Sequence, residues 1–543
     1  MSTVRLILTC VGMAVLSAVA VHAAFADPAA APAAPPTGLY ESSDSLTGDN
    51  PIDKLVLVRL KELDIQPALV CSDSVFVRRV FLDVIGTLPT EQEARAFLTS
   101  REPNKRAALI DKLLERDEFT DYWAMKWSEL LRVKAEYPIN LWPNAAQAYY
   151  HWIRDSVRKN KPYDQFARDL LLASGSNFRA PAANFYRAMQ SKDPASIAQT
   201  VALTFMGCRA EKWPKDRLAG MAAFFSQVGY KPTGEWKEEI VFYDPAKCDF
   251  AKVKAAAVFP DGVPANLVAD RDPREAFVGW LIDAKAENPY FARAIANRVW
   301  SWLVGRGIIH EPDDIRLPSP DNPPVNPQLL AYLQSELVKS KYDLKSLFRL
   351  ILNSRTYQLS SVSRSNNPQA AANFAFYSMR QLDATVLIDA LCQITGTTEK
   401  YSSATPEPFT FIPEHLRTIA LPDGSISSSF LEEFGRSPRD TGLESEGATK
   451  ATAGQRLALL NSTHVQGKIA QSRKLGAIIK SKASGRDVAE TLYLMILSRF
   501  PTPEELKTLG DYSQSGAVNQ QKREAVVDMI WALINSDEFL FRH

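Results

Sequence analysis

The sequence predicts a mainly α-helical protein with two helical domains and a few short strands near the joint between them. Apolar residues follow a helical period along most of the chain, as in 109–114, where they fall at i, i+1, i+4 and i+5 on one face. A length of 543 residues predicts two or three domains, and 46% hydrophobic with 23% charged residues is an ordinary globular composition. Segments 240–243 and 253–259 have the character of short strands amid Pro and Gly.

Changes in composition divide the chain into five parts. They are a signal peptide (1–26), a Pro/Ala-rich linker (27–50), an N-terminal helical domain (51–230), an irregular joint with short strands (231–270) and a C-terminal helical domain (271–543). The signal peptide has a positive start at Arg5, an apolar run and a small-residue cleavage site before Asp27. The alternative is an uncleaved membrane anchor, although the run is near the lower length limit for a spanning helix. We therefore expect a periplasmic or extracellular protein without a membrane partner after cleavage.

The same periodicity predicts individual helices. They cover 122–131, 149–157, 163–172, 194–206, 276–285, 290–304, 327–339 and 344–352. An internal echo supports this helical interpretation: residues 81–90 parallel 493–502, and each copy ends in a Pro-Thr turn before an acidic helix start. Asp-Glu-Phe then recurs at 117–119 and 537–539. The echo predicts two similar helical units at opposite ends of the chain.

Charge and cysteine content exclude some classes of protein. The chain has 63 Lys+Arg against 62 Asp+Glu, a formal net charge of +1, which argues against non-specific nucleic-acid binding. Beyond the signal peptide the cysteines are Cys71, Cys208, Cys248 and Cys392, with no Cys-x-x-Cys pair. Export permits disulfides, but the sequence does not decide their pairing, and buried free thiols are the alternative.

The first candidate site follows the helix that contains Asn297–Trp300. Asp313 and Asp314 are candidate acids and bases, and Arg306, His310 and Arg316 are candidate ligand contacts. The alternative is structural: the two aspartates cap a turn and pair with Arg306 or Arg316.

The second candidate site lies in the longest irregular stretch, 400–450, because long loops within a domain are often functional. Glu444 and Glu446 are candidate catalytic carboxylates, and Arg436 and Arg439 are candidate contacts for an anionic or sugar-like ligand. The alternative is a solvated loop held by Arg–Glu pairs.

Signatures of common enzymes and of metal sites are missing from the sequence. It contains no Walker loop, Rossmann fingerprint, HExxH, GxSxG or CxxCH. His151, His415 and His464 are isolated, so no metal site is expected, and His543 is expected to be mobile.

Five long motifs occur in order along the chain, at 76–90, 288–300, 305–316, 353–360 and 434–439. These motifs resemble a planctomycete cytochrome-c-associated family of two paired domains of unknown function, and the resemblance spans about residues 52–543. It implies an exported protein, because members are exported, and it implies a carbohydrate context, because members accompany sulfatases and polysaccharide-degrading enzymes. Members often carry an additional cytochrome-c-like domain, which is not expected before residue 52 here.

This chain departs from the family pattern at two places. Where relatives carry Cys-x-x-Cys-His, it has Cys208 followed by Arg-Ala-Glu-Lys, so the second thiol and the axial histidine of a c-type haem are missing. Where relatives carry Cys-x-Cys-Glu, it has Leu-Glu-Ser-Glu at 443–446. We therefore expect no cofactor.

Together, the residues and the resemblance predict an exported non-haem protein of uncharacterised role, with a binding or supporting role in polysaccharide-linked processes. Its expected partner is a carbohydrate or another exported protein. The alternative is a hydrolase-like enzyme that uses a carboxylate/arginine cleft. Haem electron transfer is a third class, which the lost haem motif disfavours.

Overall fold

The computed structural model describes residues 38–282, 290–316, 321–447, 451–481, 483–514 and 522–543. The predicted signal peptide, residues 27–37 of the linker and residues 283–285 of one predicted helix lie outside the described residues. The described chain is mainly α-helical, as predicted, with short strands in two small sheets. Among the described helices, none combines the length and the apolar character needed to cross a membrane.

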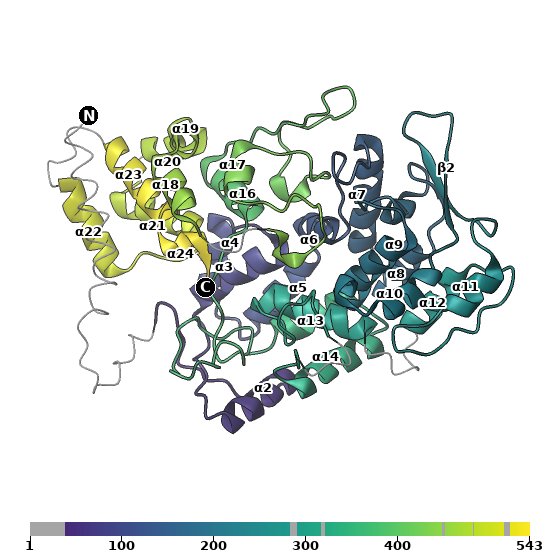
Figure 1. The fold of residues 1–543 in the computed structure, drawn as a ribbon. Helices are drawn as coiled ribbons and strands as arrows, with labels where there is room; N and C mark the ends of the chain where they lie inside the picture. Colours follow the sequence, from purple (N-terminus) through teal and green to yellow (C-terminus); the bar gives the residue numbers. More distant parts are fainter. Residues whose placement is uncertain (1–37, 283–289, 317–320, 448–450, 482, 515–521) are drawn as a thin grey trace.

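Figure 1 shows the helices in chain order, from purple to yellow. They are α2 (Pro51–Glu62), α3 (Asp73–Ile85), α4 (Glu91–Thr99), α5 (Lys105–Leu114), α6 (Asp117–Leu130), α7 (Pro143–Arg158), α8 (Tyr163–Leu171), α9 (Pro194–Val201), α10 (Lys215–Ala223), α11 (Phe250–Ala256), α12 (Pro273–Ile282), α13 (Phe291–Val304), α14 (Pro327–Lys339), α15 (Leu344–Leu352), α16 (Ala384–Thr395), α17 (Ser429–Glu433), α18 (Ala453–Asn461), α19 (Thr463–Ala470), α20 (Arg473–Lys480), α21 (Gly485–Ile496), α22 (Pro503–Gln514), α23 (Lys522–Ile534) and α24 (Asp537–Leu540). Shorter helical turns include the π-helical η3 (Ala202–Met206) and the 3-10 turn η7 (Glu444–Glu446).

The strands form two small antiparallel sheets. β1 (Gly175–Ser176), β3 (Glu239–Tyr243) and β2 (Val228–Pro232) form the first sheet, in that spatial order, with Val228 opposite Tyr243. β4 (Arg380–Gln381) pairs with β5 (Phe541–Arg542) in the second. The second sheet therefore joins the middle of the chain to the segment after α24.

The predicted strand at 240–243 is confirmed in β3, but the strand predicted at 253–259 is wrong. Its first part is the end of helix α11, and Val258 forms only an isolated bridge with Pro264. The side chain of Asp249 caps this helix by accepting a hydrogen bond from the backbone N–H of Ala251. Alanine and lysine, which are strong helix formers, fill most of the helix and outweigh its Val and Phe residues.

Local sequence explains where helix α3 begins and ends. The side chain of Ser72 caps its first turn by accepting a hydrogen bond from the backbone N–H of Val75. Gly86 ends it in the left-handed conformation, with φ of 60°. A β-carbon at this position would collide with the ring of Tyr122, so only glycine lets helix α6 pack so closely.

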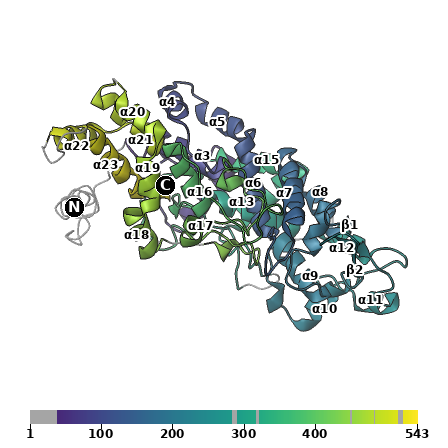
Figure 2. The ribbon, with the colours of Figure 1, turned by 90° about the horizontal axis from the view of Figure 1, so that it is seen from above.

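The two echoed units have the same local construction. In each unit a threonine and a glutamate three residues later cap the helix reciprocally, as Thr90 and Glu93 do in α4. An arginine is then held between two glutamates, Arg116 by Glu93 and Glu118, and Arg499 by Glu505 and Glu538. Figures 1 and 2 show the units side by side, with α4 against α21.

A buried carboxylate, Asp83 on α3, interacts with side chains from distant parts of the chain. Its side chain is fully buried and accepts hydrogen bonds from the hydroxyls of Tyr357 (3.0 Å) and Tyr377 (2.9 Å). The guanidinium groups of Arg380 and Arg542 lie 3.3 and 3.6 Å from its other oxygen. This carboxylate therefore connects α3 with both strands of the β4–β5 sheet.

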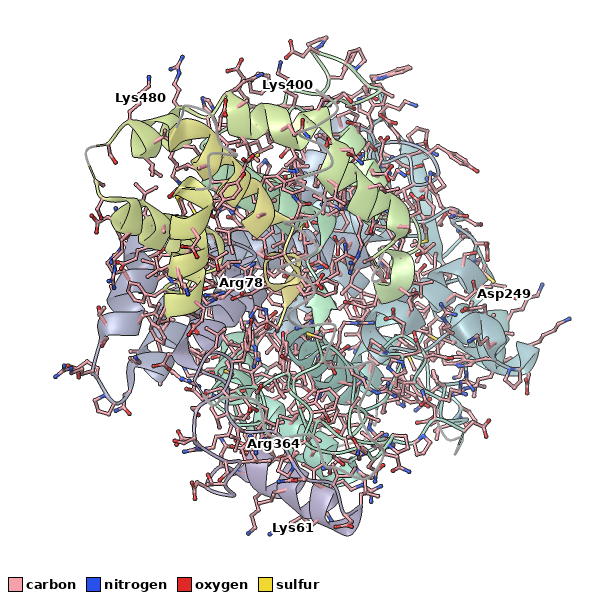
Figure 3. All side chains as sticks on the ribbon, turned by 90° about the vertical axis from the view of Figure 1, so that its left-hand side faces the viewer. Lys61, Arg78, Asp249, Arg364, Lys400 and Lys480 are labelled. Carbon is pink, nitrogen blue, oxygen red and sulfur yellow. The ribbon has the colours of Figure 1, made fainter. Side chains whose placement is uncertain are left out.

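Two further buried arginines of α3 hold the C-terminal helices. Arg78 donates to the carbonyls of Ile496 (2.8 Å) and Phe539 (2.7 Å), and Figure 3 shows it where the purple and yellow helices meet. Arg79 donates to the carbonyls of Tyr357 (2.7 Å) and His543 (2.9 Å). These bonds bind distant parts of the chain into one contiguous core.

The prediction that His543 is mobile is wrong. The residue is only 8% exposed, and its ring packs edge-on against Tyr40 with 6.0 Å between ring centroids. Burial lowers the pKa of this histidine to about 4, so it is neutral at physiological pH. The bond from Arg79 to its backbone explains why this segment is fixed.

Replacing the buried carboxylate in the variant Asp83→Asn should destabilise the protein strongly. The change removes the carboxylate that faces Arg380 and one of the two carboxylates that face Arg542, so we expect the free energy of unfolding to fall by about 3 kcal/mol. Denaturation in urea, followed by circular dichroism, measures this. Asp155→Asn is the control, because the Asp155–Arg158 pair is about half exposed, and it should cost less than about 0.5 kcal/mol. Equal losses in the two variants would contradict the central role of Asp83.

Candidate functional site

The loop after α13 and the turn η7 meet at Asp313. One carboxylate oxygen of Asp313 lies 2.7 Å from Nη2 of Arg298, a buried residue of α13. The other oxygen accepts a hydrogen bond of 2.6 Å from the backbone N–H of Glu444, which is 131 residues further along the chain. The two predicted site segments are therefore in contact here, and both oxygens of Asp313 have partners.

The carboxyl group of Glu444 lies in a poorly solvated position beside Asp313. Burial and, second, the negative charge of Asp313 raise the pKa of Glu444 to about 6, although Lys126 and the indole of Trp302 act in the opposite direction. The Trp302 indole nitrogen is buried and has no other hydrogen-bond partner among the described residues. A carboxyl group with this pKa exchanges its proton near neutral pH, as a general acid or base must.

Lys126 on α6 interacts both with Glu444 and with a second carboxylate, Asp383. Its ammonium group lies 3.5 Å from Asp383 and 3.3 Å from Glu129. Burial alone would raise the pKa of Asp383, but Lys126 and Arg542 hold it far below its usual value. Asp383 is therefore ionised over the pH range in which Glu444 carries a proton. We call Glu444, Asp313, Lys126, Asp383 and Trp302 the Glu444 cluster.

One side of the Glu444 cluster is aromatic, and another side is open to solvent. The Trp302 ring packs against Trp123 and Trp127 of α6, with centroid distances of 5.1 and 5.9 Å. A cavity of about 40 Å³ behind these rings is too small for a substrate. By contrast, the side chains of Lys126 and Asp383 are 18% and 36% exposed, so these two members of the cluster contact solvent.

The other residues of the first candidate site lie outside this cluster. Asp314 is paired with Arg316 (2.7 Å), as the structural alternative predicts, and also with Lys212 (3.0 Å). His310 is exposed, and partial burial together with the charge of Arg306 lowers its pKa. The alternative in which Asp313 pairs with Arg306 or Arg316 is wrong, because the partner of Asp313 is Arg298.

Most of the second candidate site stabilises its own loop. Arg436 donates to the carbonyl of Ile426, and Arg439 donates to those of Leu421 (3.1 Å) and Pro422 (3.2 Å). Burial lowers the pKa of Arg436 to about 9. Glu446 accepts hydrogen bonds from the backbone N–H groups of residues 440 (2.8 Å) and 441 (2.9 Å). The side chains of Arg436, Arg439 and Glu446 are therefore occupied within the protein, whereas that of Glu444 faces the cluster.

Sequence reasoning missed Lys126, Asp383 and Trp302. A lysine inside the aromatic helix 122–131 and an aspartate immediately before a helix belong to no motif. The one usable signal was Lys126 itself, because a charged residue between Trp123 and Trp127 on a largely buried helix requires a partner.

The described cysteines are unpaired and scattered along the chain. Of the two possibilities that the sequence leaves open, the structure has free thiols at Cys71, Cys208, Cys248 and Cys392. Cys208 is buried, its thiol donates to the carbonyl of Ile315 at 3.1 Å, and burial raises its pKa to about 12. Within the described ranges, no group of three His, Cys, Asp or Glu residues has a metal-binding arrangement.

Comparison with protein families gives two matches along the chain. Residues 51–226 match PSCyt2, a protein of unknown function (DUF1549), and residues 273–513 match PSD1, a protein of unknown function (DUF1553). Comparison with curated proteins and with solved structures gives no match. Lys126 lies in the first matched region, and the other four residues of the Glu444 cluster lie in the second.

The variant Glu444→Gln should change thermal stability in a pH-dependent manner. The pKa of Glu444 is raised to about 6 in the native protein, so its favourable contribution is complete below the unfolded-state pKa and is lost as the pH rises through 6. Glutamine resembles the protonated form. We therefore expect an unchanged Tm at pH 4.5 and a Tm about 2 °C above that of the unsubstituted protein at pH 7.5, measured by calorimetry.

Glu446→Gln is the matched control for this prediction. It weakens hydrogen bonds to two backbone N–H groups and should lower Tm at both pH values. A difference between Glu444→Gln and the unsubstituted protein that does not vary with pH would show that Glu444 titrates normally.

Proposed function

Because the chain belongs to the planctomycete cytochrome-c-associated family, whose two paired domains have no assigned function, we propose its function from the geometry of the Glu444 cluster. The proposal is an exported, hydrolase-like enzyme that acts in polysaccharide-linked processes, with Glu444 as its proton donor. The alternative from the sequence, a carboxylate/arginine cleft, is thereby revised to a carboxylate/lysine cluster.

The observation that carries the proposal is the opposite ionisation of two carboxyl groups around one lysine. The pKa of Glu444 is raised to about 6, whereas that of Asp383 is held far below its usual value. Such a divergence separates a general acid from a carboxylate that stays ionised. In a hydrolytic step, Glu444 would donate its proton to the leaving oxygen, while Asp383 would stay ionised and stabilise the positive charge that develops in the transition state. The attacking water would then return a proton to Glu444.

Asp313 has a positioning role in this proposal. Both of its oxygens already accept hydrogen bonds, from Arg298 and from the backbone of Glu444. It therefore fixes the turn that carries Glu444, and its charge keeps a proton on Glu444 to a higher pH. Asp314, which pairs with Arg316 and Lys212, has no part in the proton transfer.

The substrate class and the location come from the resemblance and from the predicted signal peptide. Relatives accompany sulfatases and polysaccharide-degrading enzymes, so a polysaccharide or a fragment of one is the proposed substrate. The periplasm or the extracellular space is the proposed location.

Binding or support without turnover is the second candidate function. It is favoured by the internal hydrogen bonds of Arg436, Arg439 and Glu446, because these bonds leave the predicted carboxylate/arginine catalytic cleft without its arginines. In that case the Glu444 cluster would hold a polar ligand and perform no proton transfer.

Hydrolysis of a polysaccharide panel, measured as new reducing ends, tests the enzyme proposal. Activity should fall as the pH rises above about 6 because Glu444 loses its proton. Glu444→Gln should reduce the rate about 100-fold or more, whereas Glu446→Gln, two residues further along the same turn, should keep most of the activity. Full activity in Glu444→Gln would contradict the proposal, and an inactive unsubstituted protein across the panel would favour the binding function.

Expression with the haem-maturation machinery tests the third class, electron transfer. Covalent c-type haem requires two accessible thiols and a histidine ligand, whereas Cys208 is buried and is followed by Glu211 and Lys212 at the other motif positions. The absorbance spectrum of the denatured, acid-washed protein should therefore lack a Soret band. A retained band would contradict the non-haem assignment.

A further inference from the structure

Three aromatic rings from distant parts of the chain meet on the surface near the start of α7. Trp142 directly precedes α7, Trp236 lies in the turn between β2 and β3, and Phe409 lies in the loop after α16. The Trp142 ring centroid lies 6.4 Å from that of Trp236 and 5.4 Å from that of Phe409. The ammonium group of Lys237 lies 5.5 and 5.3 Å from the Trp142 and Trp236 centroids. We call these four side chains the aromatic face; Figure 1 shows the β2–β3 hairpin projecting beside α7.

The aromatic face is exposed to solvent and does not belong to the core. Trp236 is 71% exposed and Phe409 is 47% exposed. Large aromatic side chains are usually buried to a high degree, so a gathering of exposed rings indicates a binding surface.

The backbone around Trp142 is held in an unusual conformation. Its φ of 73° is rare for a bulky side chain. Such strain persists only where the surroundings impose it, and it concentrates at ligand sites. Here the backbone N–H of Trp142 donates to the carbonyl of Ala135 at 3.0 Å.

The loop that carries Phe409 is tied to the same segment. One carboxylate oxygen of Glu136 accepts hydrogen bonds from the hydroxyl of Ser403 (3.3 Å) and the backbone N–H of Thr405 (3.2 Å). The rings are thus presented on connected loops, which reduces the entropy that a ligand must remove when it binds.

We propose that the aromatic face binds a polysaccharide chain. A pyranose ring has one apolar face of C–H groups and an edge of hydroxyls, so it can stack on Trp236 and Phe409 while its edge meets polar side chains. Arg179 and Glu235, an exposed ion pair 3.1 Å apart, supply a donor and an acceptor beside Trp236. Lys237 adds a positive charge for acidic sugars.

The size of the surface favours a carbohydrate over a protein partner. The exposed parts of the three rings sum to roughly 300 Å², because each such side chain buries about 150–250 Å² in full contact. A stable protein interface buries about 800 Å² on each partner. A few sugar units, in contrast, cover a patch of this size.

This inference rests on the proposed function and deepens it. It names a surface, separate from the Glu444 cluster, that binds the polysaccharide. The inference and the proposed function can be contradicted independently, because a binding experiment tests the aromatic face and a hydrolysis experiment tests the Glu444 cluster.

Affinity electrophoresis of the mature chain through gels containing laminarin, xylan, alginate or carrageenan tests the inference. At least one polysaccharide should retard the protein, and Trp236→Ala and Phe409→Ala should each weaken that binding about tenfold. If the bound polysaccharide is acidic, Lys237→Ala should weaken binding to it as well. Circular dichroism checks that each variant is folded.

Trp213→Ala is the matched control, because Trp213 is a partly exposed tryptophan with Arg217 4.0 Å from its ring centroid. It should bind polysaccharide normally. The inference is overturned if no polysaccharide retards the unsubstituted protein or if Trp236→Ala and Phe409→Ala bind as it does. It is also overturned if Trp213→Ala weakens binding as much as those two variants. A dimer in light scattering that Trp236→Ala dissolves would assign the face to self-association instead.

Discussion

The buried charge of Asp83 is the constraint on which the arrangement of the site depends. Its partner Arg380 also donates to the carbonyls of Trp302 (2.8 Å) and Leu303 (3.0 Å) at the end of α13. Its other partner, Arg542, reaches Asp383 at 3.1 Å. Asp83 thus positions two members of the Glu444 cluster without contacting a ligand. Burying these charges carries a desolvation cost. In return, the directional contacts of the buried charges specify one arrangement of the segments that they join.

The chemistry of the cluster follows from unequal access to positive charge. Asp383 has both Lys126 and Arg542 as close cations, whereas Glu444 has the negative charge of Asp313 next to it. Arg298 compensates Asp313 directly and Glu444 only at longer range. The pKa values of Glu444 and Asp383 therefore diverge because close cations offset burial at Asp383, whereas burial and the charge of Asp313 act together at Glu444.

Local patterns predicted much of the fold, and distance in the chain limited what they could predict of the site. Helices 327–339 and 344–352 agree with the structure to the residue, because their periodicity and their caps at Asn326 and Asp343 are local signals. The pairing of Asp314 with Arg316, two residues away, is equally local. The contact between Asp313 and Glu444 joins residues that are 131 positions apart in the chain, and sequence spacing does not predict contacts over such a distance. The strand predicted at 253–259 failed because the capping bond of Asp249 outweighed weak strand propensity.

The bond from Arg79 to the backbone of His543 spans 464 residues, and this separation has a consequence for the order of folding. Asp83 cannot meet Arg542 until nearly the whole described chain has been synthesised. Until then, the early helices lack their final partners. Contacts this distant in sequence also close slowly.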